Sequence, residues 1–169
     1  MDGSEKLDDN NQSIPTYNQD VIKGFAHVFT GWHFHETTED TWYHWWQNFN
    51  LMEPMQSVAA FHDTSEKTLF SGVLLAANQT PEQDLSDALD ALANHSNVAP
   101  FISKQLIQKL VTSNPSLAYV SRIANVFANN GYGERGDLSA VVKAILLDEE
   151  ARNGHEVSPE TFGKVREPL

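Results

Sequence analysis

The chain has 169 residues, 40% hydrophobic and 20% charged, a composition typical of globular proteins and unlike that of disordered or membrane-spanning chains. Its net charge of −12 repels phosphate backbones and anionic lipids, so neither nucleic-acid binding nor membrane insertion is expected. Because there is no cysteine, disulfides, thiolate nucleophiles and cysteine-bound metals are excluded.

The opening of the chain is polar. Residues 1–16 are predicted to be a flexible lead-in, followed by a single mostly helical domain over residues 17–169. The opening has neither a basic region nor an apolar one, so it does not resemble a signal peptide. If the parent protein is exported, its signal lies outside this chain.

The first predicted helix spans residues 19–30. Its apolar side chains recur every three or four residues, Asn18 is placed to cap its start, and Gly31 suits its end. The tryptophan-rich residues 41–50 fit either a short helix or an aromatic strand. Short apolar runs near residues 57–76 predict extended segments or a small hairpin.

Four amphipathic helices are predicted in the second half of the chain. The first begins at Pro81, with Thr80 as its cap and Gln83 in the position that completes a capping box. The other three are predicted over residues 98–112, from Asn114 as cap with Pro115 next to it, and over residues 136–151 with Asp137 as cap. Together with the first helix they predict a mainly α fold, a bundle of about five helices.

The order of five motifs resembles that of a bacterial family. The motifs are "YNQDVIKGFAHVFTGW" (17–32), "FHDTSEKTLFSG" (61–72), "QDLSDALDALANHSNVAPFISKQLIQKLV" (83–111), "GDLSAVVKAILLDEEA" (136–151) and "KVREP" (164–168). This succession is similar to the family called domain of unknown function 1800, from about residue 17 onward. The tryptophan-rich residues 37–50 depart from the family's usual pattern.

The resemblance implies a larger, exported protein. Family members are considerably longer than this chain, which implies that the chain is an internal or C-terminal portion of a bigger protein. Members often carry export signals, which implies a periplasmic or extracellular parent. Members are also often encoded beside a sulfatase-like family, so the implied partners are the remainder of the parent chain and a sulfatase-like protein. The family has no established biochemical activity.

The densest polar group lies in "FHDTSEK", where His62 stands beside Asp63 and shortly before Lys67. A carboxylate can orient an imidazole and raise its basicity, so these three residues are candidates for general base catalysis. The structural alternative is that Asp63 caps a turn through backbone N–H groups while Lys67 forms an ion pair.

Two histidines alternate in the stretch "WHFH". On a strand, His33 and His35 would point to the same face and could share a divalent metal ion. Zinc sites usually need three or four protein ligands, and this spacing supplies two. Apart from this metal, no cofactor is predicted.

The four tryptophans are candidates for a binding surface. Trp32, Trp42, Trp45 and Trp46 offer flat apolar faces that could stack on the sugar rings of a glycan. The favoured alternative is burial in the core or in a subunit contact, because each indole buries on the order of 200 Å².

Two functions therefore compete. The first is a non-enzymatic helical module of a larger exported protein, with an assembly role or a binding role toward a partner protein or a glycan. The alternative is a fragment of a hydrolytic or metal-assisted enzyme with its site around His62, Asp63 and Lys67. The enzyme hypothesis requires these side chains to converge in one concave pocket. The module hypothesis predicts instead that each side chain has a structural partner of its own.

Overall fold

The computed structural model describes residues 6–47 and 50–164 of the chain. Its contacts define two compact units: unit 1 comprises Met1–Ser13 and Ser96–Leu169, and unit 2 comprises Ile14–His95. The single domain predicted over residues 17–169 stays a prediction, because two compact units can belong to one domain. Within the described residues, no helix combines the length and the apolar character needed to cross a membrane.

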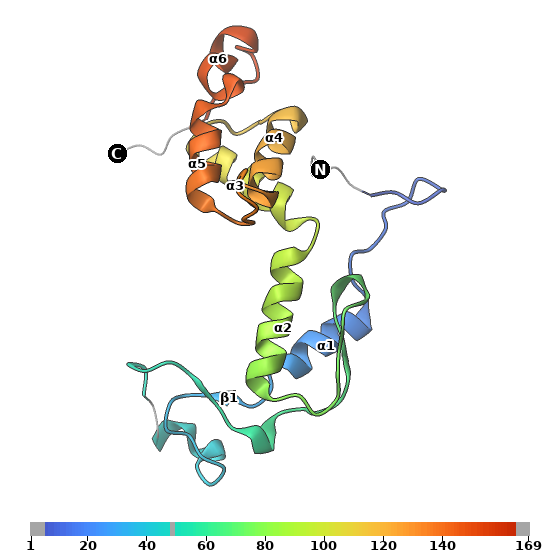
Figure 1. The fold of residues 1–169 in the computed structure, drawn as a ribbon, viewed down its shortest axis with the longest axis vertical. Helices are drawn as coiled ribbons and strands as arrows, with labels where there is room; N and C mark the ends of the chain where they lie inside the picture. The colour runs from blue at the N-terminus through green and yellow to red at the C-terminus, as the bar shows by residue number, and fades with distance from the viewer. Residues whose placement is uncertain (1–5, 48–49, 165–169) are drawn as a thin grey trace. The chain divides into compact units, whose positions relative to one another are not determined.

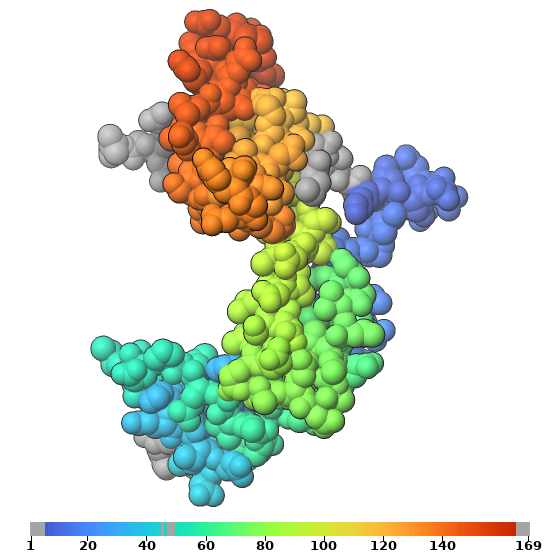
Figure 2. Space-filling model, viewed as in Figure 1, coloured from blue at the N-terminus to red at the C-terminus, as the bar shows by residue number. Residues whose placement is uncertain are grey.

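Unit 2 consists of two helices joined by a long segment with short strands and 3-10 turns (Figure 1). Its elements in chain order are α1 (Gln19–Val28), β1 (Trp32–His33), η1 (Trp42–Gln47), β2 (Gln56–Ser57), η2 (Ala59–Phe61), β3 (Lys67–Thr68), η3 (Phe70–Gly72), β4 (Leu74–Leu75) and α2 (Pro81–Asn94). In the space-filling view, the segment around η1 forms one end of this unit (Figure 2).

Both helices of unit 2 begin at the caps that the sequence predicts. The Asn18 side chain accepts hydrogen bonds from the backbone N–H groups of Asp20 and Val21, each at 3.1 Å. Thr80 accepts one from the Gln83 backbone N–H at 3.2 Å. The Gln83 side chain donates to Asp87 instead of reaching back to Thr80. Of the predicted capping box, the hydrogen bond to the Thr80 hydroxyl therefore forms, and the return bond from the Gln83 side chain does not.

Two small antiparallel sheets connect the helices. Strand β1 pairs with β2, with Trp32 opposite Ser57. Strand β3 pairs with β4, with Lys67 opposite Leu75. The second pair is the hairpin that the sequence predicts near residues 57–76.

The core of unit 2 is small and depends on one close backbone approach. Four fully buried apolar side chains form it: Val28, Leu69, Leu75 and Ala88. Helix α1 passes so close to β3 that a Cβ atom on Gly24 would lie 2.1 Å from the Thr68 carbonyl oxygen. Only glycine permits this approach, which sets β3 and the polar residues next to it against α1.

Unit 1 is a helical assembly with its own core. Its helices are α3 (Val98–Leu110), α4 (Leu117–Ala128), α5 (Leu138–Leu147) and α6 (Glu149–Val157). Buried apolar residues from α3, α4 and α5 form the core: Ala99, Ile107, Tyr119, Val120, Ile123, Ala124, Phe127, Val141 and Ile145. The Tyr119 hydroxyl donates to the Ile145 carbonyl oxygen at 2.6 Å, so the largest of these side chains keeps a polar partner.

The sequence predicts two helix boundaries in unit 1 incorrectly. Helix α4 is capped by Ser116, which accepts from the Tyr119 N–H at 3.1 Å, and not by the Asn114–Pro115 pair. The helix predicted over residues 136–151 is two helices, because Asp148 has extended backbone angles and caps α6 by accepting from the Glu150 N–H at 2.9 Å. The Asp137 cap of α5 is as predicted.

The fold class follows the prediction. The described residues are mainly α, and their strands occur only as two-stranded pairs. At the start of the chain, within the predicted lead-in, Leu7 and Ser13 form an isolated antiparallel bridge.

Candidate functional site

A buried polar cluster lies inside unit 2, formed by His62, Lys67 and Asp84. The His62 Nε2 atom lies 3.0 Å from Asp84 Oδ2, and the Lys67 Nζ atom lies 2.7 Å from the same oxygen. The three side chains are at most 1% exposed to solvent. The sequence indicates His62 and Lys67 as candidate site residues. It does not indicate Asp84, which binds both of them in the structure.

Each side chain of the buried cluster comes from a different element. His62 follows η2, Lys67 begins β3 and Asp84 lies near the start of α2. Asp84 belongs to the face of α2 that carries the buried residues Pro81 and Ala88. Its carboxylate near the N-terminus of α2 is also favoured by the positive end of the helix dipole.

The Lys67 ammonium group has an acceptor for each of its three protons. Besides Asp84, it donates to the carbonyl oxygens of Asp63 at 2.6 Å and Ser65 at 2.9 Å. A buried ammonium needs such complete pairing, because an unpaired buried charge is strongly destabilising. Lys67 thus holds the 63–67 turn against α2, and no proton of its ammonium is left over for a substrate.

The His62 ring also faces acceptors on both sides. Its Nδ1 atom lies 3.0 Å from the Thr30 carbonyl oxygen, and its Nε2 atom lies 3.0 Å from Asp84 Oδ2. Both ring nitrogens therefore lie against oxygen atoms of the protein, and the side chain is 1% exposed. A general base must reach the proton that it removes, and this buried ring faces protein atoms instead.

Asp63 lies at the edge of the cluster and fixes the turn. Its Oδ1 atom accepts from the Ser65 N–H at 2.9 Å and from the Ser65 hydroxyl. Its Oδ2 atom lies 3.2 Å from His27 Nδ1, and Lys67 Nζ lies 3.9 Å from Oδ1. The Ser65 side-chain and backbone hydrogen bonds, with the nearby charges of His27 and Lys67, lower the pKa of Asp63. This is the turn-capping geometry of the structural alternative.

Thr30 connects this turn to the end of α1. Its hydroxyl donates to the His27 carbonyl oxygen at 2.6 Å and accepts from the Asp63 N–H at 2.8 Å. Gly31 follows with φ of +82°, and a Cβ atom there would lie 3.0 Å from the His62 Cβ. The glycine lets the His62 backbone lie close to the end of α1.

One oxygen of the cluster lacks a protein partner. Among the described residues, the buried Asp84 Oδ1 atom has no hydrogen-bond partner. A buried carboxylate oxygen of this kind suits an internal water molecule, which would supply the missing donor.

Sequence reasoning missed Asp84 and Thr30. A signal for Asp84 exists, because an acidic residue four positions before Ala88 shares its face of α2. The apolar residues of this helix at helical spacing, Leu85, Ala88, Leu89 and Leu92, predict its buried face, yet Leu89 is exposed. For Thr30 no signal exists, because its partners in the cluster and the turn, His62 and Asp63, lie 32 and 33 residues away along the chain.

The two candidate metal ligands lie in different settings. His33 is on β1, and its Nδ1 atom accepts from the Phe34 N–H at 2.9 Å and lies 2.9 Å from the Thr37 hydroxyl. His35 lies beyond the end of β1, so the two histidines do not share a strand face. Within residues 6–47 and 50–164, no three His, Cys, Asp or Glu side chains are arranged to hold a metal ion.

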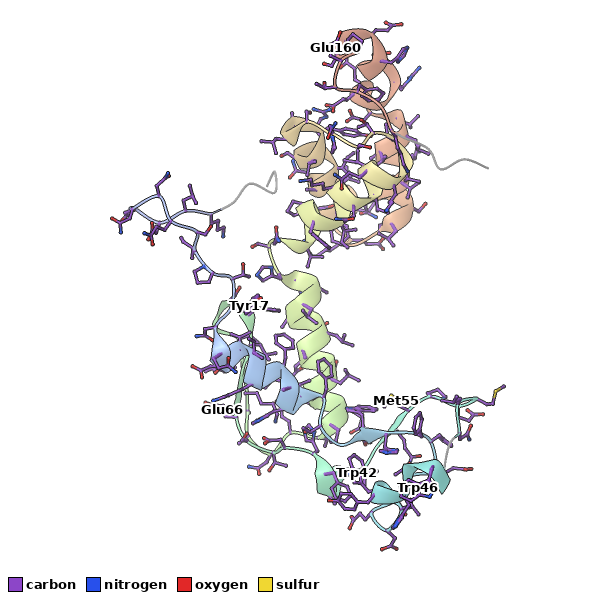
Figure 3. All side chains as sticks on the ribbon, turned by 180° about the vertical axis from the view of Figure 1, so that it is seen from behind. Tyr17, Trp42, Trp46, Met55, Glu66 and Glu160 are labelled. Atoms are coloured by element: carbon purple, nitrogen blue, oxygen red, sulfur yellow. The ribbon has the colours of Figure 1, made fainter. Side chains whose placement is uncertain are left out.

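The tryptophans divide into packed and exposed ones. Trp42 stacks on Phe61 with ring centroids 4.3 Å apart, and its ring lies 4.9 Å from that of His33. Trp32 is half-buried, whereas Trp46 is exposed to solvent (Figure 3). The side chain of Trp45 lies outside the described part of the structure.

A separate cavity of about 650 Å³ lies in unit 1, lined by residues just before α4, by Arg122 of α4, by α6 and by the segment that follows α6. Its charged lining includes Arg122, which donates to both oxygens of Asp148 at 2.8 and 2.7 Å. Glu150 in the same lining accepts from the Ser116 N–H at 2.9 Å. These charges pair with one another and hold the start of α6 against α4.

These features define a mainly α protein whose densest polar cluster is internal. The chain belongs to the family described as protein of unknown function (DUF1800), whose sequence profile matches residues 7–169. Searches of curated proteins and of solved structures returned no match.

Proposed function

We propose that this chain is a non-enzymatic module of a larger exported protein, with an assembly role or a binding role toward a partner protein or a glycan. The observation that carries the proposal is the burial of His62, Lys67 and Asp84, whose side chains are at most 1% exposed and are bonded to one another. A general acid or base must lie within hydrogen-bond reach of a substrate, and these groups face protein atoms.

The expected surroundings of the module come from its family. Members of the family are longer and often exported, which supports a periplasmic or extracellular parent and contact with the remainder of the parent chain. A sulfatase-like protein is a proposed partner, because members of the family are often encoded beside a sulfatase-like family. The exposed aromatic side chains around η1 supply a surface for such contacts, because solvent-facing tryptophan and tyrosine are typical of interfaces.

The competing function is a hydrolytic or metal-assisted enzyme with its site around His62, Asp63 and Lys67. The 3.0 and 2.7 Å contacts of His62 and Lys67 with Asp84 favour it, because they bring titratable groups together. It would require the cluster to open toward solvent and the Lys67 ammonium to lose at least one of its acceptors. Because each proton of the Lys67 ammonium already has a protein acceptor, we favour the structural role.

Chemical modification of the folded protein distinguishes the two functions. Diethylpyrocarbonate should modify the exposed His155 rapidly and leave His62 unmodified, and an amine-reactive acetylating reagent should modify the exposed Lys104 and spare Lys67. Peptide mass spectrometry reads each position. In denaturant, all four side chains should react, which shows that the protection depends on folding.

The proposal fails if His62 or Lys67 of the folded protein reacts as fast as its exposed counterpart. The binding role has its own measurement, because tryptophan fluorescence reports contacts near η1. Titration with a panel of polysaccharides tests glycan binding, and no response across the panel would count against this ligand class.

A further inference from the structure

One wall of the cavity in unit 1 is formed by the segment that follows α6. The position of this segment is fixed by Gly163, whose carbonyl oxygen accepts from the Ser113 N–H at 2.8 Å and from the Thr112 hydroxyl at 3.1 Å. The Phe162 ring packs directly on Gly154 of α6, where a Cβ atom would overlap the ring. The wall is therefore held in place by contacts within unit 1, so that a ligand would not have to order it.

One face of α6 forms another wall of the cavity. Arg152 and His155 belong to other faces of this helix, because they fall outside the arc that the lining residues occupy at 3.6 residues per turn. The lining residues of α6 are Glu149, Glu150, Asn153, Gly154 and Val157. Helix geometry therefore places polar and apolar groups side by side on the cavity wall.

Two polar side chains of the cavity wall are unpaired. Among the residues that the structure describes, the Glu149 carboxylate and the Asn153 amide take part in no hydrogen bond and no close ion pair. Glu149 and Asn153 are four positions apart on α6, so their side chains are neighbours on its surface. The Asp148 carboxylate differs, because Arg122 donates to both of its oxygens. Glu149 and Asn153 are therefore available to a ligand.

The lining of the cavity has an excess of negative charge. It contains one guanidinium group, that of Arg122, and three carboxylates, those of Asp148, Glu149 and Glu150. The hydrogen bond to Asp148, with the charges of Asp148, Glu150 and Glu149, raises the pKa of Arg122. The guanidinium stays charged and bound to Asp148, and a positively charged ligand would be attracted by the remaining carboxylates.

We propose that this cavity binds an organic ammonium ion that carries a hydrocarbon chain. The ammonium group would donate to the Glu149 carboxylate and to the side-chain oxygen of Asn153, and the chain would lie against Val157 and Phe162. The volume of about 650 Å³ is within the range of ligand-binding pockets. Such cations occur as free polyamines and as lysine side chains of peptides. The proposal goes beyond the module role, because the cavity shares no residue with the buried cluster of unit 2.

The same lining disfavours other classes of ligand. An anion would face three carboxylates, and the single guanidinium already donates to both oxygens of Asp148. A metal ion usually needs three or four protein ligands, and the described residues contain no such group of His, Cys, Asp or Glu. A neutral apolar molecule would leave the Glu149 carboxylate and the Asn153 amide without a role.

The test uses the full chain and two cationic probes. Spermidine represents a free polyamine, and a blocked glycine–lysine–glycine tripeptide represents a peptide side chain. Isothermal titration calorimetry should detect at least one of them, whereas methylammonium, which has no chain, should bind more weakly and the dianion glutarate should not bind. Glu149→Gln should weaken binding about tenfold, because a hydrogen bond between two charged groups is lost.

Glu156→Gln distinguishes the cavity from general attraction to an acidic protein. Glu156 is on the same helix, its side chain is 76% exposed, and it is not part of the cavity lining. The variant loses the same charge as Glu149→Gln and should change the affinity less than about twofold. Amide NMR shifts of the wild type with the bound probe should change in α6 and in residues 158–163. This mapping needs no variant, and circular dichroism confirms that both variants are folded.

The results separate the two sources of the cation and can overturn the proposal. Binding of spermidine alone identifies a free polyamine, binding of the tripeptide alone identifies a peptide side chain, and binding of both shows that the cation is recognised in either form. The proposal fails if neither probe binds, if glutarate binds or methylammonium binds as tightly as the probes, or if Glu149→Gln and Glu156→Gln weaken binding equally. It also fails if the amide shifts change only outside the cavity. The modification of His62 and Lys67 tests the module role separately.

Discussion

At the scale of single residues, unit 2 keeps a buried lysine by pairing it with a buried carboxylate. Lys67 and His62 share one carboxylate oxygen of Asp84, and the remaining donors of both side chains face carbonyl oxygens. Pairs of this kind add little net stability compared with apolar side chains, but removing one partner leaves a buried charge without its counter-charge. The cluster is therefore a sensitive point of the fold.

Replacing the shared acceptor tests this dependence. Asp84→Asn keeps the size of the side chain but removes the charge that faces Lys67 and His62. We expect the free energy of unfolding to fall by about 3 kcal/mol or more, measured by urea denaturation at pH 7. Asp90→Asn is the matched control, because Asp90 lies on the same helix with its side chain exposed, and its effect should be small. Equal stability of the two variants would contradict the structural role.

The sequence predicts this cluster only in part, for a physical reason. The short stretch of residues 61–67 stands out because it is dense in polar groups, among them His62, Asp63 and Lys67. Asp84 lies 22 residues after His62, and the contact depends on how α2 packs, which periodicity alone does not determine. The sequence therefore identifies the charged residues of the turn and misses the residue that neutralises them.

At the scale of elements, helix caps are predictable where they depend on neighbouring residues. Asn18, Thr80 and Asp137 act as caps in the positions that the sequence indicates. Asp148 is different, because the acidic run after residue 147 is compatible with a continuous helix. Arg122, from α4, binds both carboxylate oxygens of Asp148, and this long-range contact accompanies the break between α5 and α6.

The contact between Asp148 and Arg122 predicts a loss of stability in acid. Burial alone would raise the pKa of Asp148, but hydrogen bonds from Arg122 and the Glu150 N–H, with the Arg122 charge, hold it below 3.8. A carboxyl whose pKa is lowered by folding stabilises the folded state above its unfolded value. This contribution should be complete above about pH 5 and disappear as the pH falls through 3.8 to the folded pKa.

Urea denaturation of the wild type and of Asp148→Asn between pH 7 and pH 3 measures this contribution. The difference in unfolding free energy between the two proteins should shrink as the pH falls, because the wild-type carboxylate becomes protonated. Glu149→Gln, at the adjacent exposed position, should show no comparable change with pH. A wild-type advantage that stayed constant down to pH 3 would show that the charge of Asp148 is not the source.

At the scale of the whole chain, periodicity predicts the fold class but not the division into units. Apolar residues at helical spacing are a local property, so the mainly α class follows from the sequence. The two buried clusters share no residue: one joins Val28, Leu69, Leu75 and Ala88, and the other lies among α3, α4 and α5. The packing of one amphipathic face against another depends on side chains that are far apart in the chain. Local periodicity does not determine which faces pack together.

Separate cores predict separate effects of core substitutions on amide hydrogen exchange. Leu69→Ala removes a fully buried side chain from the core of unit 2, and Ile145→Ala removes one from the core of unit 1. Each should cost about 2–5 kcal/mol. Exchange should accelerate in α1 and α2 for the first variant and in α3, α4 and α5 for the second, because protection reports local cooperative units. If either variant accelerated exchange equally in both sets of helices, the chain would unfold as one cooperative domain, as predicted over residues 17–169, and the two cores would not be independent.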